Sequence, residues 1–241
     1  MNQLLPSLIF CLQNAKYLFI LFLPAITLDV VQLYLLLSFV VSKFYAGMSP
    51  SELLEALQLM PTAINTIGIF SNLLFVILSG ALPILFLSVK QNTKTPNQPM
   101  FQALKKFFPL FTIWLIFYFL LMAYLVFLTA YFGIIGLIIV VVTFLYLFVR
   151  IGLAPTFIVL NNKSPIEAVR LSFAATSEHL RKLLKLITLC FFIQFGLSVI
   201  SFWLFGANIL FIIFSTLLKY FILAIIFYLL FSLYEAKYQN N

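Results

Sequence analysis

The sequence predicts an all-α integral membrane protein with six transmembrane helices in three hairpins. Of the 241 residues, 64% are hydrophobic and only 8% are charged, whereas a soluble domain carries about 25% charged residues. A soluble fold would therefore have too little polar surface. Apolar stretches of membrane-spanning length recur along the whole chain, and the basic residues between them fall almost entirely on one side.

Six segments reach the roughly 20 apolar residues that a bilayer requires. They are 17–42, 64–89, 108–131, 134–160, 184–206 and 209–234. Phe132-Gly133 joins the third to the fourth, and Gly206-Ala207-Asn208 joins the fifth to the sixth. Such short connections predict hairpins within one membrane domain, 1–241. The first span is too long for a signal-peptide core, so we expect it to be retained.

The distribution of basic residues predicts the orientation. If the N-terminus is inside, the outer side holds only Lys43 and two basic residues fall within spans. The inner side holds eleven: Lys16, Lys90, Lys94, Lys105, Lys106, Lys163, Arg170, Arg181, Lys182, Lys185 and Lys237. The positive-inside rule then places both termini in the cytoplasm.

Short amphipathic helices are expected beside the spans. The mixed first 16 residues suit an interfacial helix. The outer loop 43–63 contains Ser49-Pro50-Ser51-Glu52, which has the pattern of a capping box with proline at the first helical position. On the inner side, we expect short helices near 101–106 and over 165–183.

The segment 165–183 has the clearest helix signals. Ser164 suits the N-cap, Pro165 the first position, and Glu167 closes a capping box. One side of the predicted helix is apolar, and Glu178 can pair with Arg181 or Lys182. The expected apolar side consists of Ile166, Val169, Phe173, Leu180 and Leu184.

A weak internal repetition accompanies these elements. Ala81-Leu82-Pro83 and Leu153-Ala154-Pro155 each precede a polar turn, a basic amphipathic helix and a new span. This predicts three parallel units, about 1–90, 91–162 and 163–241. The alternative, that any protein built of hairpins needs basic interfacial helices, stays open.

Three charged residues fall within the spans. At 1.5 Å per residue, Asp29 and Lys219 lie near the midplane and Arg150 lies nearer the inner boundary. Matching depth favours an Asp29–Lys219 pair, with Asp29–Arg150 second. Charges at this depth usually face partners inside the bundle. They form a candidate polar path or ligand site, which Gln32, Asn65, Asn72 and Gln194 could join; the alternative is a structural ion pair with interhelical hydrogen bonds.

Basic residues on the inner helices are candidate contacts for anionic lipid headgroups, since each gains about 1 kcal/mol near an anionic leaflet. The candidates are Arg170, Arg181, Lys182, Lys185, Lys105 and Lys106. The alternative is that they serve only to anchor the topology.

Catalytic motifs are missing. Asp29 is the only aspartate, which excludes a two-aspartate intramembrane protease, and no HExxH, Walker or GxSxG motif occurs. His179 is the only histidine, and Cys11 and Cys190 lack metal-ligand spacing. We therefore expect no enzyme, no metal or other cofactor, and no nucleic-acid partner.

The chain resembles the uncharacterised YciC-type family of inner-membrane proteins of Gram-negative bacteria. The resemblance is carried by Gly133-Ile134-Ile135-Gly136, Leu153-Ala154-Pro155, the run from Pro165 to Ser172, and Thr176. It implies a bacterial cytoplasmic membrane and supplies no catalytic or ligand residues. We expect a non-enzymatic membrane protein that supports the envelope by binding lipid or assisting a partner. The alternative is a small transporter of a lipid or amphiphile, with Asp29, Lys219 and Arg150 along its path.

Overall fold

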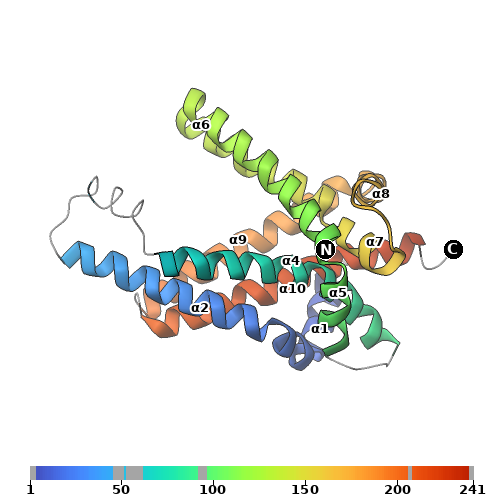
Figure 1. The fold of residues 1–241 in the computed structure, drawn as a ribbon, viewed down its shortest axis with the longest axis horizontal. Helices are drawn as coiled ribbons and strands as arrows, with labels where there is room; N and C mark the ends of the chain where they lie inside the picture. The colour runs from blue at the N-terminus through green and yellow to red at the C-terminus, as the bar shows by residue number, and fades with distance from the viewer. Residues whose placement is uncertain (1–3, 46–51, 53–61, 92–96, 206–207, 239–241) are drawn as a thin grey trace.

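The computed structural model describes residues 4–45, 52, 62–91, 97–205 and 208–238 (Figure 1). Regular secondary structure in this part of the chain is helical. The helices are α1 (Leu4–Gln13), α2 (Ala15–Tyr45), α4 (Thr62–Lys90), α5 (Asn97–Lys105), α6 (Phe107–Ile151), α7 (Ala154–Asn161), α8 (Pro165–Ser177), α9 (Leu180–Phe205) and α10 (Ile209–Tyr238).

Six stretches of these helices are long and apolar enough to cross a membrane. They are Ala15–Val40, Thr62–Lys90, Phe107–Leu128, Ile138–Asn161, Leu180–Ile200 and Ile209–Tyr238. The all-helical fold class is therefore confirmed, and six apolar helical stretches of spanning length are present where the sequence predicts spans. Helices also form at the N-terminus (α1) and before the third span (α5), where the sequence predicts short ones.

Gly133 reverses the chain within α6. Its φ of 54° and ψ of −128° lie outside the helical region, in a conformation that glycine adopts at little cost. The Trp114 and Phe148 rings are 6.2 Å apart, and the Phe117 and Phe144 rings 5.7 Å. The two halves of α6 thus lie side by side. The part between Trp114 and Phe148, here called the arm, projects from the bundle (Figure 1).

The predicted fourth span, 134–160, is two helices. α6 ends at Ile151 and α7 begins at Ala154, with Pro155 in its first turn, where a proline costs no hydrogen bond. A Cβ on Gly152 would lie 2.7 Å from Leu230 Cδ1 and 2.7 Å from the Phe148 carbonyl oxygen. The chain bends here because only glycine admits this close approach to α10.

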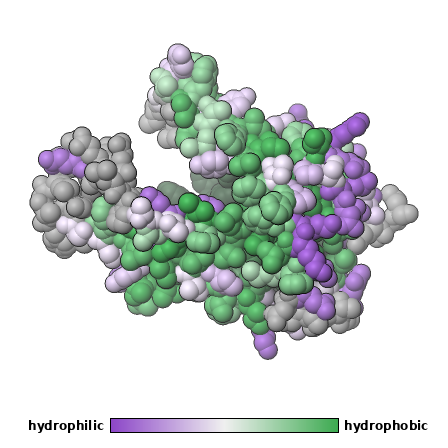
Figure 2. All heavy atoms as spheres, viewed as in Figure 1, coloured by the Kyte–Doolittle hydropathy of each residue, from purple (hydrophilic) through white to green (hydrophobic). Residues whose placement is uncertain are grey.

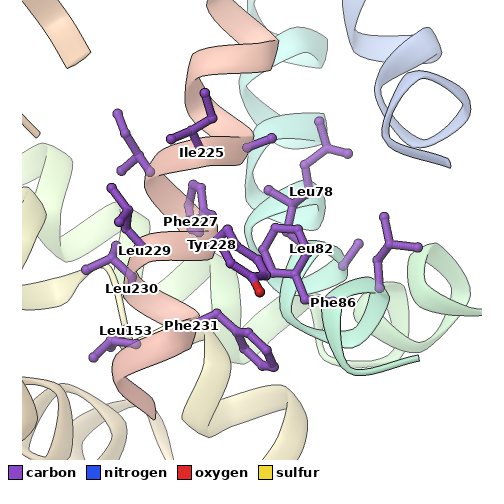
Figure 3. Close-up of a cluster of buried hydrophobic side chains, with 14 of the residues drawn as sticks. Leu78, Leu82, Phe86, Leu153, Ile225, Phe227, Tyr228, Leu229, Leu230 and Phe231 are labelled. Atoms are coloured by element: carbon purple, nitrogen blue, oxygen red, sulfur yellow. The ribbon is translucent and has the colours of Figure 1, made fainter. Parts of the chain in front are cut away.

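The core lies toward one end of the bundle, where the second halves of α4 and α10 are buried (Figure 3). Phe86 of α4 packs edge-on against Tyr228 of α10, with ring centroids 5.2 Å apart. Phe10 of α1 stacks on the same tyrosine at 4.1 Å. The predicted interfacial helix α1 is therefore packed into the core through one of its faces.

The predicted helix 165–183 is wrong in its length. α8 ends at Ser177, and Leu180 already begins α9. On the apolar side that the sequence indicates, Ile166 is 82% exposed. α8 packs on the bundle through small side chains, which are Ala168, Ser172, Ala175 and Thr176. Small residues allow the close approach to α6 that larger ones would block.

The cap predicted at the start of α8 is present. The Glu167 amide donates to Ser164 Oγ at 3.4 Å, and the Glu167 carboxylate pairs with Lys163 at 2.7 Å. Glu178 pairs with Lys237 of α10 at 3.3 Å, although the sequence favoured its neighbours on the next turn. Apart from Glu52, the outer capping box lies outside the described residues, as does the connection at 206–207.

Candidate functional site: an intramembrane polar cluster

Two helices, α4 and α10, bring side chains to the carboxylate of Asp29, which is 6% exposed in the middle of α2. Lys219 of α10 places its Nζ 2.6 Å from Oδ2. The Tyr220 hydroxyl donates to the same oxygen at 3.0 Å, and the Ser71 hydroxyl of α4 donates to Oδ1. We call these four residues the polar cluster.

Helix register explains the meeting. Asp29 contacts Ser71, while Gln32 lies against Gly68, so α2 and α4 run antiparallel. A Cβ at position 68 would lie 2.5 Å from Gln32 Nε2, so glycine lets the two helices approach. At 1.5 Å per residue, Lys219 lies about 15 Å and Ser71 about 14 Å from the first residue of its helix.

The cluster is closed on one side and open on the other. The side chain of Asp29 is 8% exposed, whereas that of Lys219 is 50% exposed. The carboxylate accepts three hydrogen bonds and its negative charge has a counter-charge, which is what a buried charge requires. The ammonium is bonded to Asp29 but still reaches open space.

Thr216 adds an unsatisfied group one turn from Lys219 and Tyr220. The threonine is 2% exposed, and its Oγ1 has no hydrogen-bond partner in the described part of the chain. Sequence reasoning missed Ser71, Tyr220 and Thr216. For Tyr220 and Thr216 the available signal was their position near Lys219. Tyr220 follows Lys219 directly, and Thr216 precedes Lys219 by three residues on the same helix face.

Arg150 does not join this cluster. Its guanidinium donates to the Phe173 carbonyl oxygen at 2.9 Å and lies between the Tyr146 and Phe173 rings, at 5.5 and 5.2 Å from their centroids. The Ser172 hydroxyl donates to the Arg150 carbonyl. Arg150 therefore fastens α8 to the end of α6, where its positive charge suits the C-terminal turns of α8.

Two apolar hollows accompany the helices. One, of about 210 Å³, lies between α2 and α10 beside the polar cluster. Its lining is Ala15, Leu18, Phe19, Phe22, Ile26, Leu217, Tyr220 and Phe221. The other, of about 510 Å³, lies on the arm and is lined only by apolar and aromatic side chains between Phe119 and Tyr131.

Hydrophilic residues gather at the end of the bundle that carries α5, α7 and α8 (Figure 2). Five of the candidate lipid contacts are exposed there, and Lys106 is half-buried. The nearby carboxylates are used by other lysines: Glu167 by Lys163, Glu178 by Lys237 and Glu235 by Lys90. We call the six candidates the basic surface: Arg170, Arg181, Lys182, Lys185, Lys105 and Lys106.

Groups that could support chemistry or bind a metal are sparse. Within the described residues, no three His, Cys, Asp or Glu side chains lie together as metal ligands. Cys11 and Cys190 are free and buried. Burial raises the pKa of the Cys11 thiol to about 12, which disfavours the reactive thiolate.

Comparison with models of protein families, with curated proteins and with solved structures finds no match for this chain. The resemblance to the YciC-type family therefore stays a prediction.

Proposed function

We propose that the six spans form three hairpins in a bacterial cytoplasmic membrane, with both termini and the basic surface on the cytoplasmic side. Two features support this orientation: the excess of basic residues on one side of the predicted spans and their gathering at one end of the bundle. Short connections at Gly133 and near Asn208 favour the hairpins.

The function we propose is non-enzymatic binding of acidic lipid headgroups by the basic surface, in support of the cell envelope. The observation that carries it is the missing counter-charge. None of the six basic side chains forms an ion pair with a carboxylate in the described part of the chain. A phosphate group is the anion that such a surface meets at a bilayer.

Apolar side chains beside these charges suit a position at the lipid interface. Phe101, Leu104 and Phe108 are 62%, 51% and 78% exposed around Lys105, whose Nζ lies 5.1 Å from the Phe101 ring centroid. Rings and aliphatic chains inserted among acyl chains, with ammonium groups at phosphate level, are typical of interfacial helices.

The test is lipid preference in nanodiscs, measured by native mass spectrometry. We expect wild type to retain phosphatidylglycerol over phosphatidylcholine. Changing Arg181, Lys182 and Lys185 together to Gln should weaken that preference about 100-fold, since each charge contributes about 1 kcal/mol.

Lys163→Gln is the matched control, because Lys163 belongs to the same predicted inner side but is already paired with Glu167. A triple variant that folds and keeps the full preference, or a control that loses as much, would contradict the proposal.

Transport of an amphiphile is the second candidate function. It is favoured by one observation, the half-exposed ammonium of Lys219 at the centre of a span. Arg150 no longer belongs to this candidate, since it fastens α8 to α6. In the transport case, Asp29→Asn should reach the membrane in normal amount and lose substrate flux; in the structural case, the same variant should lower abundance.

A further inference from the structure

The arm of α6 diverges from α2 and α4, and open space separates it from these two helices in the space-filling view (Figures 1 and 2). We call this space the notch. It closes where Trp114 of α6 meets α4. The indole lies 5.0 Å from the Phe75 ring, and Nε1 donates to Ser79 Oγ at 2.8 Å. Trp114 thus forms the floor of the notch.

The α4 wall of the notch carries two carboxamides. Asn72 precedes Phe75 by three residues and Ser79 by seven, and Asn65 precedes Asn72 by seven, so all four share one helix face. Near Ser79, this face of α4 is covered by Trp114. Nearer the start of α4, the side chains of Asn65 and Asn72 are exposed. Neither amide makes a hydrogen bond within the described residues.

α9 contributes a third carboxamide. Phe191 packs against Phe144 and Phe148 of the arm, with ring centroids 6.3 and 6.4 Å apart. Gln194 follows one turn later on the same face and is half-buried. Its amide also has no bonding partner among the residues that the structure places.

Lys219 is joined to the α4 wall through the polar cluster. Its ammonium pairs with Asp29, which also accepts a hydrogen bond from Ser71, the residue before Asn72 on α4. Lys219 shares a stripe of α10 with Ile212 and Thr216, which are 3% and 2% exposed. In this otherwise buried stripe, the side chain of Lys219 is 50% exposed.

These groups point to a ligand with a polar, anionic head. Amides without partners are costly against hydrocarbon, so this set favours a hydrogen-bonding occupant. The amides can donate and accept, and the half-exposed ammonium of Lys219, although paired with Asp29, offers positive charge on its open side. The adjoining walls are apolar, with Ile69 59% and Tyr118 57% exposed, and the notch opens sideways to the bilayer.

We propose that the notch binds one acidic phospholipid, with its headgroup between Asn72, Gln194 and Lys219 and its acyl chains leaving between α4 and the arm. This site lies at the end of the bundle away from the basic surface and does not rest on the function proposed for that surface. For the transport candidate, the notch is the place where the substrate enters the protein.

Photo-crosslinking tests the site. Phosphatidylglycerol with a photoreactive acyl chain is placed with the full chain in phosphatidylcholine nanodiscs, and labelled peptides are located by mass spectrometry. Wild type should be labelled on 62–75 and 115–128, and unlabelled phosphatidylglycerol should compete. The double variant Asn72→Leu, Gln194→Leu should lose labelling about fivefold, through two lost amide hydrogen bonds, while leaving the Asp29–Lys219 pair intact.

Thr27→Val is the control, because Thr27 is exposed and its hydroxyl bonds only to Leu23 of its own helix. The Arg181, Lys182 and Lys185 triple variant should keep notch labelling, which separates this site from the basic surface. Unchanged labelling in the double variant with its fold intact, equal competition by phosphatidylcholine, or crosslinks from the notch to a second copy would each overturn the proposal.

Discussion

Asp29→Asn tests the polar cluster most directly. The substitution keeps the shape of the side chain and removes its charge. In the wild type, Lys219, Tyr220 and Ser71 all donate to the carboxylate. In the variant, one of the two acceptor oxygens becomes a donor group, and the ammonium loses its counter-charge at membrane depth.

The cost can be bracketed from the structure. Hydrogen bonds to charged groups contribute about 1.5–3 kcal/mol, and stranding a fully buried partner costs about 3–5 kcal/mol. Because the Lys219 side chain is 50% exposed, the lower range applies, and we expect a loss of about 2 kcal/mol. Tyr220→Phe removes one of the three donors to the carboxylate and should cost about 1.5 kcal/mol, the low end of the range for a hydrogen bond to a charged group.

The assay is reversible unfolding in mixed micelles with increasing SDS, followed by circular dichroism. Adding Lys219→Met to Asp29→Asn removes the stranded ammonium, so the double variant should be more stable than Asp29→Asn alone, with a coupling of about 1 kcal/mol. The reasoning fails if Asp29→Asn costs no more than Tyr220→Phe, or if the two substitutions are simply additive.

Two further predictions concern packing and reactivity. Gly80→Ala should destabilise by about 1–3 kcal/mol through overpacking, because its Cβ would lie 2.6 Å from Leu110 Cδ1; Gly196→Ala, with nothing within 4 Å, is the control and should be neutral or stabilising in the same unfolding assay. In a Cys190→Ser background, Cys11 should resist maleimide at pH 8 and react only on unfolding, because burial holds its pKa at about 12 and the thiolate forms only as pH approaches that value; fast labelling of the folded protein at pH 8 would contradict this.

The sequence predicts the parts of this fold that depend on length and periodicity. Six apolar stretches of spanning length become six helices of that length, because a bilayer requires the backbone to satisfy its own hydrogen bonds. Depth along a straight helix also carries information about partners. Asp29 and Lys219 match in predicted depth, and the structure places Lys219 Nζ 2.6 Å from Asp29 Oδ2.

Depth calculated from the sequence does not predict the partner of a side chain when that partner is a backbone group or when the helix is broken. Arg150 contacts the Phe173 carbonyl and two rings, none of which appears as a counter-charge in the sequence. The packed face of α8 is hard to predict for a related reason. Ser172 and Thr176 are buried because they are small and hydrogen-bonded, which apolar periodicity does not indicate. The threefold repeat stays a prediction.

The two ends of the bundle are held together by different forces, which determines which variants are informative. Near the basic surface, aromatic packing around Phe86 and Tyr228 joins α1, α4 and α10. Toward the notch, α2, α4 and α10 meet at Asp29 through an ion pair and hydrogen bonds, beside the ring contact of Phe22 with Tyr220. Substitutions in the polar cluster therefore alter stability together with the surroundings of Lys219. Within the described residues, Asn72 and Gln194 form no hydrogen bond to another element, so their substitution separates ligand binding from the integrity of the bundle.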